Sequence, residues 1–184
     1  MYAIELFVGS RLDQYVRDSW KGLKDLHITS ALPDIEGIRP HITVAVNDDI
    51  DDAEAFGEKL EDLMRSQTIL PIAIDSLSAF PETGTVFVAP AVTNELFALH
   101  RRYNEHFSAY SSSAHYHYTP DRWNPHCSLA IRLTKIQLTR ALACCLNHFK
   151  PLQSTIDAIG LVKLQYENGK CVSSITVKEI PFLT

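Results

Sequence analysis

Two short motifs in this sequence combine an imidazole with a hydroxyl group two residues later. His41 precedes Thr43, His126 precedes Ser128, and each histidine follows a proline. Side chains alternate along a strand, so each motif would present its histidine and its hydroxyl residue on the same face. Two imidazoles that titrate near neutrality can act as acid and base, while the hydroxyls bind an anion between them. Such a set suits in-line displacement at phosphorus without a metal ion.

The pairing of the motifs is more informative than either motif alone. One Pro-His-x-Ser/Thr sequence arises by chance in roughly one such chain in twenty, and two in about one in a thousand. The two motifs are separated by nearly half of the 184 residues. In each half, the sequence pattern predicts a strand, a helix, a long loop, a proline-led strand, a helix and a strand, in that order. Residues 72–77 in the first half also resemble residues 154–159 in the second. The pattern indicates an internal duplication, with repeats of about 1–84 and 85–184.

Hydrophobic periodicity and turn residues predict the elements that carry these motifs. Strands are predicted over 3–8, 41–46, 70–79, 85–89, 125–131, 154–165 and 171–179, and helices over 11–25, 52–66, 93–109 and 134–148. The alternation within the two motif strands predicts core side chains at Ile42, Val44, Val46, Cys127, Leu129 and Ile131.

The paired motifs resemble the 2H phosphoesterase superfamily, which contains 2′-5′ RNA ligases and cyclic phosphodiesterases and is defined by two His-x-Thr/Ser-hydrophobic motifs. The resemblance extends over essentially the whole chain. It implies an α+β, bilobal duplicated fold in one domain, residues 1–184, with two antiparallel sheets lining a central cleft and helices on the outside. By motif position, His41 and His126 would be catalytic, and Thr43 and Ser128 would bind phosphate.

The same resemblance implies an activity and a class of substrate. The expected reaction is metal-independent phosphoester chemistry without a cofactor, of the 2′,3′-cyclic phosphodiesterase or 2′-5′ RNA ligase type. RNA 3′ ends, 2′-5′-linked oligonucleotides or cyclic nucleotides would be the substrates. In the family, hydrolysis of a 2′,3′-cyclic phosphate leaves the phosphate on the 2′ oxygen. His41 is accordingly assigned as the acid for the leaving oxygen and His126 as the base that activates water.

Cationic residues lead into both motif strands. Arg39 shares the face of His41 and is a candidate phosphate ligand, and Arg122 lies four residues before His126. Trp123, beside the second motif, could pack in the core or line the cleft.

A loop rich in serine, histidine and tyrosine precedes the second motif. His115 and His117 could contact substrate, or hold a metal ion if a third ligand joined them. Tyr116 or Tyr118 could stack on a base. A third His-Ile-Thr sequence begins at His27, but no proline precedes it and no partner motif lies half a chain away. The histidines in helical patterns, at 100, 106 and 148, are interpreted as surface or packing residues.

Composition narrows the remaining possibilities. A formal charge of −5 argues against a protein that coats duplex DNA or RNA, and no apolar run is long enough to span a bilayer. The N-terminal stretch lacks the features of a signal peptide, so a cytoplasmic location is expected. The acidic cluster at 48–54 is interpreted as a helix start. The cysteines at 127, 144, 145 and 171 lack zinc-site spacing and are expected to be reduced thiols, mostly buried.

Two other functions stay open on the sequence. A catalytically silent nucleotide- or RNA-binding module of the same fold would tolerate Asn or Gln at the motif histidines, so the intact pair disfavours it. A metal-dependent hydrolase using His115, His117 and acidic residues would be excluded by insensitivity to chelators. The direction of the reaction, the physiological substrate and the oligomeric state are left open.

Overall fold

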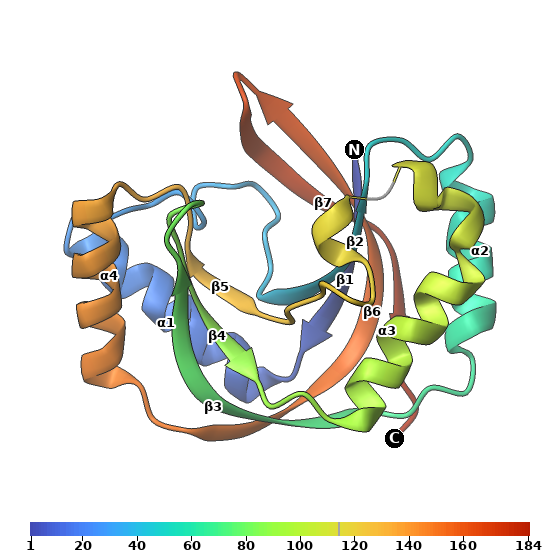
Figure 1. Ribbon diagram of the computed structural model, residues 1–184, viewed down its shortest axis with the longest axis horizontal. Helices are drawn as coiled ribbons and strands as arrows, with labels where there is room; N and C mark the ends of the chain where they lie inside the picture. The colour runs from blue at the N-terminus through green and yellow to red at the C-terminus, as the bar shows by residue number, and fades with distance from the viewer. Residues whose placement is uncertain (114) are drawn as a thin grey trace.

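The computed structural model describes residues 1–113 and 115–184 and shows an α+β protein (Figure 1). Its elements are, in order, β1 (Tyr2–Val8), α1 (Ser10–Asp25), β2 (His41–Asn47), α2 (Ala53–Met64), β3 (Leu70–Phe80), β4 (Thr85–Pro90), α3 (Asn94–His106), η1 (Ser108–Ser113), η2 (Tyr116–Tyr118), β5 (Cys127–Ala130), α4 (Lys135–His148), β6 (Leu152–Glu167) and β7 (Lys170–Pro181). Every predicted strand and α-helix is present, with bounds that differ by at most three residues.

Side-chain caps explain where three of the helices begin. Asp52 accepts a hydrogen bond from the backbone N–H of Ala55 at the start of α2, which confirms the helix-start interpretation of the acidic cluster. Thr93 caps α3 in the same way. Thr134 and Gln137 form a reciprocal capping box at the start of α4.

The strands pair antiparallel in a single seven-stranded sheet. The pairing order is β2-β1-β6-β3-β4-β5, and β7 pairs with β6. β6 is long enough to serve both parts of the sheet, since 152–156 pair with β3, 156–163 pair with β1, and 158–167 pair with β7. Two separate sheets were expected, but β6 makes the strand pairing continuous.

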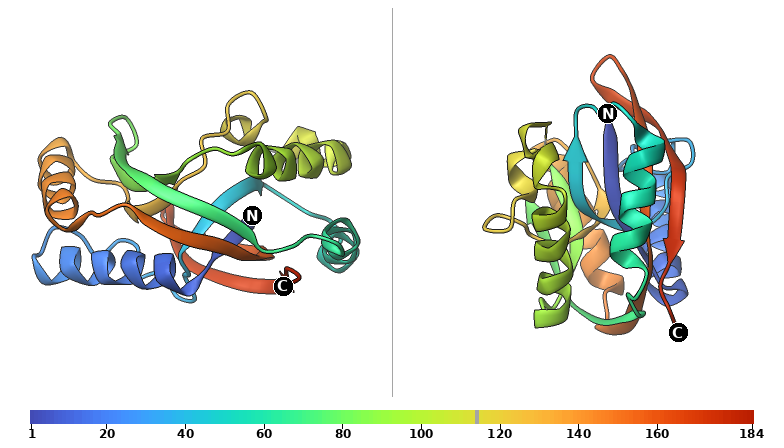
Figure 2. Two further views of the ribbon diagram at one scale, coloured as in Figure 1. Left: turned by 90° about the horizontal axis from the view of Figure 1, so that it is seen from below. Right: turned by 90° about the vertical axis from the view of Figure 1, so that its right-hand side faces the viewer.

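The helices lie on two opposite sides of the molecule. Figures 1 and 2 show α1 and α4 on one side and α2 and α3 on the other. The pairing order reads the same from either end when β1, β2 and β6 are matched with β4, β5 and β3. Such an order is what two similar halves would produce, and the repeat bounds stay a prediction.

A β-bulge in β2 changes which of its side chains enter the core. Thr43 pairs with Glu5, whereas Ala45 pairs with the adjacent Ile4, so β2 contains one extra residue at this point. The extra residue reverses the alternation, and Ala45 packs in the main core while Val46 joins a separate small cluster on the other side. The prediction that Val46 shares the core face of Ile42 is therefore wrong.

The second motif strand ends earlier than predicted. β5 stops at Ala130, so Ile131 is only half-buried; it packs against the main core and also lines a cavity. All four cysteines are free; Cys127 and Cys145 are buried and the other two are partly buried. None of the helices in the described ranges has the length and apolar character of a membrane-spanning segment.

Candidate active site

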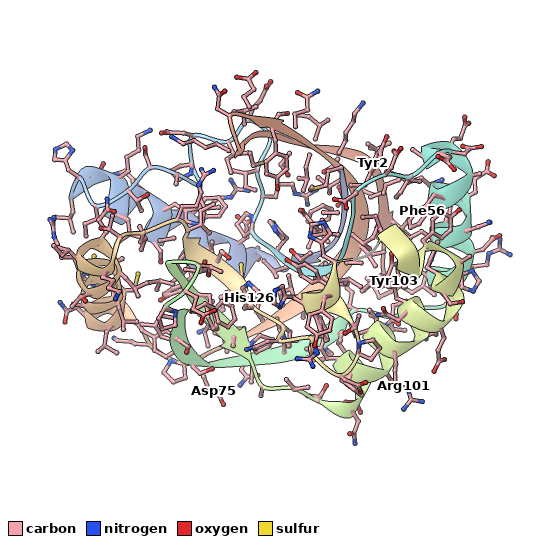
Figure 3. All side chains as sticks on the ribbon, turned by 45° about the horizontal axis from the view of Figure 1, so that its top comes forward. Tyr2, Phe56, Asp75, Arg101, Tyr103 and His126 are labelled. Carbon is pink, nitrogen blue, oxygen red and sulfur yellow. The ribbon has the colours of Figure 1, made fainter. Side chains whose placement is uncertain are left out.

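The two motif strands lie at opposite ends of the pairing order, yet they contact each other. β2 and β5 approach closely because the sheet curves round on itself. His126 accordingly lies near the centre of the molecule (Figure 3). His41 is close enough that its charge lowers the pKa of His126.

Both motifs place their side chains as the strand alternation predicts. The histidines and hydroxyl residues are partly exposed, whereas the intervening residues are buried in the main core: Ile42, Val44, Cys127 and Leu129. Because one face of each motif strand is buried, the histidine and the hydroxyl residue of each motif must lie together on the opposite face.

The two histidine rings are held by matching hydrogen bonds. His41 Nδ1 lies 2.7 Å from the main-chain oxygen of Arg39, and His126 Nδ1 lies 2.7 Å from that of Asn124. A carbonyl oxygen only accepts, so Nδ1–H is the donor in each case. In the neutral rings Nε2 then carries the lone pair and can take up a proton. A proline follows each carbonyl residue and restricts that residue to extended conformations.

His126 has an apolar surrounding. The rings of Phe80 and Phe87 lie 5.1 Å and 5.0 Å from it, centroid to centroid. Burial is the main cause that lowers the pKa of His126 below its usual value of 6.5, and the charge on His41 adds to it. The neutral ring, which can accept a proton, is therefore favoured at neutral pH.

His41 has a carboxylate beside it that the sequence analysis missed. Glu5 Oε2 lies 3.4 Å from His41 Nδ1, and Glu5 is only 3% exposed. Burial raises the pKa of Glu5, while the charges of His41 and Arg39 act in the opposite direction. One charged residue within the otherwise apolar or aromatic strand Tyr2–Val8 was the signal that could have identified it.

The guanidinium of Arg39, a predicted phosphate ligand, is paired with a carboxylate. Its Nη1 donates to Glu179 Oε2 at 2.7 Å, and the group lies 3.8 Å above the ring of Phe7. Phe7 in turn occupies the space that a side chain at Gly160 would need, since a Cβ there would come within 2.5 Å of the ring. A phosphate contact by Arg39 would compete with Glu179, and this role stays a prediction.

Two residues from the chain segment before the second motif form hydrogen bonds with Thr43. Tyr118 forms a side-chain hydrogen bond with Thr43, and Trp123 Nε1 donates to the main-chain oxygen of Thr43 at 2.8 Å. Trp123 is nearly buried and stacks on the buried ring of His100, with centroids 3.9 Å apart. It therefore packs in the core and also contributes to the wall of the site.

A cavity of about 940 Å³ opens beside the second motif. Ser128 and His126 form part of its wall together with Arg122 and three of the loop candidates, which are His115, His117 and Tyr118. Tyr116 does not line it but lies under the guanidinium of Arg122, 4.1 Å from Cζ to the ring centroid. The cavity is large enough for a nucleotide-sized ligand.

Four of the remaining histidines do not line this cavity. His27, His106 and His148 are exposed, and His100 is buried. His115 Nε2 lies 2.9 Å from Asp48. Within the described ranges, no three His, Cys, Asp or Glu side chains form a group that could hold a metal ion.

The sequence also matches the model of a known protein family. Residues 15–168 match the 2′-5′ RNA ligase superfamily. The chain belongs to this superfamily. The match confirms the resemblance to the 2H phosphoesterase superfamily, and no curated protein sequence matches the chain.

Several solved structures share the fold of this superfamily member. The chain is similar to TT0787 of Thermus thermophilus, with a TM-score of 0.66, 10% identity, and 98% and 97% of the two chains covered. It is similar to E. coli LigT complexed with 3′-AMP, with a TM-score of 0.62, 10% identity, and 100% and 98% covered. A further structure described as a phosphoesterase has a TM-score of 0.62, 12% identity and the same coverage.

Proposed function

We propose that this chain is a metal-independent phosphoesterase that uses His41 and His126 as acid and base. The matching Nδ1 hydrogen bonds of the two histidines, on strands that contact each other, are the observation that carries this proposal. They leave both Nε2 atoms free for proton transfer, which binding alone would not require. Membership of the 2′-5′ RNA ligase superfamily supports phosphoester chemistry.

In the proposed reaction, the substrate phosphate lies between the two motifs. His126 Nε2 takes a proton from a water molecule, whose oxygen attacks phosphorus. The bond from phosphorus to the leaving oxygen breaks, and His41 Nε2–H protonates that oxygen. Thr43 and Ser128 donate hydrogen bonds to the non-bridging oxygens, where negative charge increases in the transition state. For a 2′,3′-cyclic phosphate the leaving oxygen is the 3′ oxygen, and the product keeps its phosphate at 2′.

The proposed substrates are cyclic nucleotides, 2′-5′-linked oligonucleotides or RNA 3′ ends. LigT, which shares the fold, has been crystallised with 3′-AMP, ATP and NADP+. The cavity beside His126 has room for a nucleoside and offers aromatic side chains at Tyr118 and Trp123. These two features favour a nucleotide over a smaller phosphoester.

A substrate screen with matched variants tests this function. Purified chain is incubated with 2′,3′-cyclic nucleotides, 2′-5′-linked oligonucleotides and RNA 3′ ends, and the products are separated by chromatography. Asparagine can still donate to the carbonyl that holds each ring but cannot transfer a proton near neutrality, so His41→Asn and His126→Asn are expected to bind substrate without turning it over. His27→Asn is the control, because His27 also begins a His-Ile-Thr sequence but is exposed outside the site. Equal turnover by all variants would contradict the proposal.

A further inference from the structure

Glu5 and Phe87 occupy corresponding places beside the two motifs. Glu5 on β1 pairs with Thr43 on β2, and Phe87 on β4 pairs with Ser128 on β5. Directly paired residues of antiparallel strands have their side chains on the same face. Each of the two also reaches the nearby histidine, since Glu5 Oε2 is 3.4 Å from His41 Nδ1 and the rings of Phe87 and His126 are 5.0 Å apart.

These two neighbours act on an imidazole in opposite ways. A carboxylate stabilises the positive charge of a protonated ring, whereas an aromatic wall removes water and favours the neutral ring. Both histidines are hydrogen-bonded through Nδ1 to a main-chain carbonyl. They differ in the neighbouring side chain, which is a carboxyl group beside His41 and an aromatic ring beside His126.

We propose that Glu5 is a positioning residue that keeps a proton on His41, and that the contrast between Glu5 and Phe87 decides which histidine is the acid. This inference rests on the proposed function for the direction of proton transfer, but its effect on His41 can be measured without any substrate.

Glu5 is the acidic side chain that pairs with the His41 ring among the described residues, and the charges of His41 and Arg39 favour its ionised form against the effect of burial. The charge of Arg39 acts on Glu5, but Arg39 is itself paired with Glu179. Glu5 also acts on Tyr118 and Tyr166 and on Cys127 and Cys171, and burial raises the pKa of each of these four groups. They are therefore neutral near pH 7. His126, whose pKa the charge of His41 affects, has a pKa that burial lowers, so it adds little positive charge there.

The substitution Glu5→Gln distinguishes a positioning role of Glu5 from a purely structural one. If the carboxylate served only to fill the space beside His41, Glu5→Gln would keep its shape and leave the titration of His41 unchanged. A positioning carboxylate stabilises the protonated ring, so its loss must move that titration. The amide is nearly isosteric with the carboxylate, which makes Glu5→Gln the informative change, and Glu5→Asp restores the charge in a second variant.

The first measurement is an NMR titration of the histidine ring signals in the full, substrate-free chain. In Glu5→Gln the midpoint of the His41 signals is expected to fall by about one pH unit, as for loss of a nearby opposite charge. In Glu5→Asp it is expected to return towards the wild-type value. Asp48→Asn is the matched control, because it removes the carboxylate that lies 2.9 Å from His115 and should leave the His41 midpoint unchanged. An unchanged His41 midpoint in folded Glu5→Gln would overturn the inference.

The second measurement is the pH dependence of kcat/KM for a 2′,3′-cyclic nucleotide. If His41 is the acid, activity is lost on the alkaline side as His41 loses its proton, so Glu5→Gln should move that limb to lower pH and leave the acidic limb in place. Movement of the acidic limb instead would overturn the assignment of His41 as the acid. Absence of any turnover in the wild type would contradict the proposed function, and the ring titration would still decide the role of Glu5.

Discussion

Trp123 donates from its indole Nε1 to the main-chain oxygen of Thr43 at 2.8 Å, although 80 positions separate the two residues. Trp20 makes the corresponding bond to the main-chain oxygen of Ser128 at 3.0 Å. Within the part of the chain that the structure describes, β2 and β5 end the strand order, so no further strand pairs with their outer edges. Each motif is thereby tied to a tryptophan from the other half of the sequence.

Loss of either indole bond should destabilise the protein. Trp123→Phe keeps an aromatic ring on His100 but leaves the Thr43 oxygen without its donor, at an expected cost of about 1 kcal/mol. For a chain of this size that corresponds to a fall in Tm of roughly 2–4 °C. Thermal unfolding followed by circular dichroism measures it, and Trp20→Phe should show a fall of similar size. Unchanged Tm in both variants would show that the indole bonds do not stabilise the motif strands.

His100 should make stability depend on pH in the acidic range. It is fully buried, and burial lowers its pKa to about 4, from 6.5 when unfolded. Above pH 6.5 the ring is neutral in both states. As the pH falls from 6.5 to 4, only the unfolded chain takes up the proton, so the free energy of unfolding decreases by up to about 3 kcal/mol.

His100→Gln tests this dependence. The variant should have a lower Tm at pH 7.5, because it loses the stacking on Trp123, but a smaller further drop between pH 7.5 and pH 4.5 than the wild type. Identical drops in the two proteins would argue against His100 as the source.

Glu5 should reduce stability at neutral pH. Its pKa is raised by burial, so above pH 4.5 the unfolded chain releases this proton more readily than the folded chain, which lowers the free energy of unfolding. Glu5→Gln removes that effect, and the free energy of unfolding at pH 7.5 should increase by on the order of 1 kcal/mol. At pH 4 and below the carboxyl is protonated in both states, and the gain should disappear. A variant less stable than the wild type at both pH values would contradict this prediction.

Local sequence patterns predicted the elements well because their determinants are local. The alternation around His41 and His126 and the cap at Thr134 lie within a few residues of the structures that they specify. The bulge that turns Val46 out of the main core depends on how β2 pairs with β1, and no local pattern reports it.

The missed features of the site join residues far apart in the chain. Glu5 reaches His41 only after β1 pairs with β2, and Arg39 meets Glu179 only after β7 is in place. The polar pairs of the motifs were predictable from their spacing, whereas the environment that distinguishes His41 from His126 was not.

The roles of the two histidines predict unequal rescue by a good leaving group. A nucleotide 4-nitrophenyl phosphodiester releases an anion that needs no protonation, so His41→Asn should recover much of its lost rate with this substrate. His126→Asn should recover little, because the attacking water still needs a base. The comparison is the ratio of kcat/KM for this diester and for a 2′,3′-cyclic nucleotide in each variant. Equal recovery, or recovery by His126→Asn alone, would show that the roles are assigned wrongly.

The most direct test of two-histidine, metal-independent catalysis is the rate of 2′,3′-cyclic nucleotide hydrolysis in the presence of excess EDTA. The wild type and His27→Asn are predicted to keep the rate measured without chelator. His41→Asn and His126→Asn are each predicted to lose about 10²–10⁴-fold in kcat/KM while keeping the wild-type fold by circular dichroism. Loss of wild-type activity in EDTA with recovery on adding a divalent ion, or full activity in both motif variants, would contradict the account.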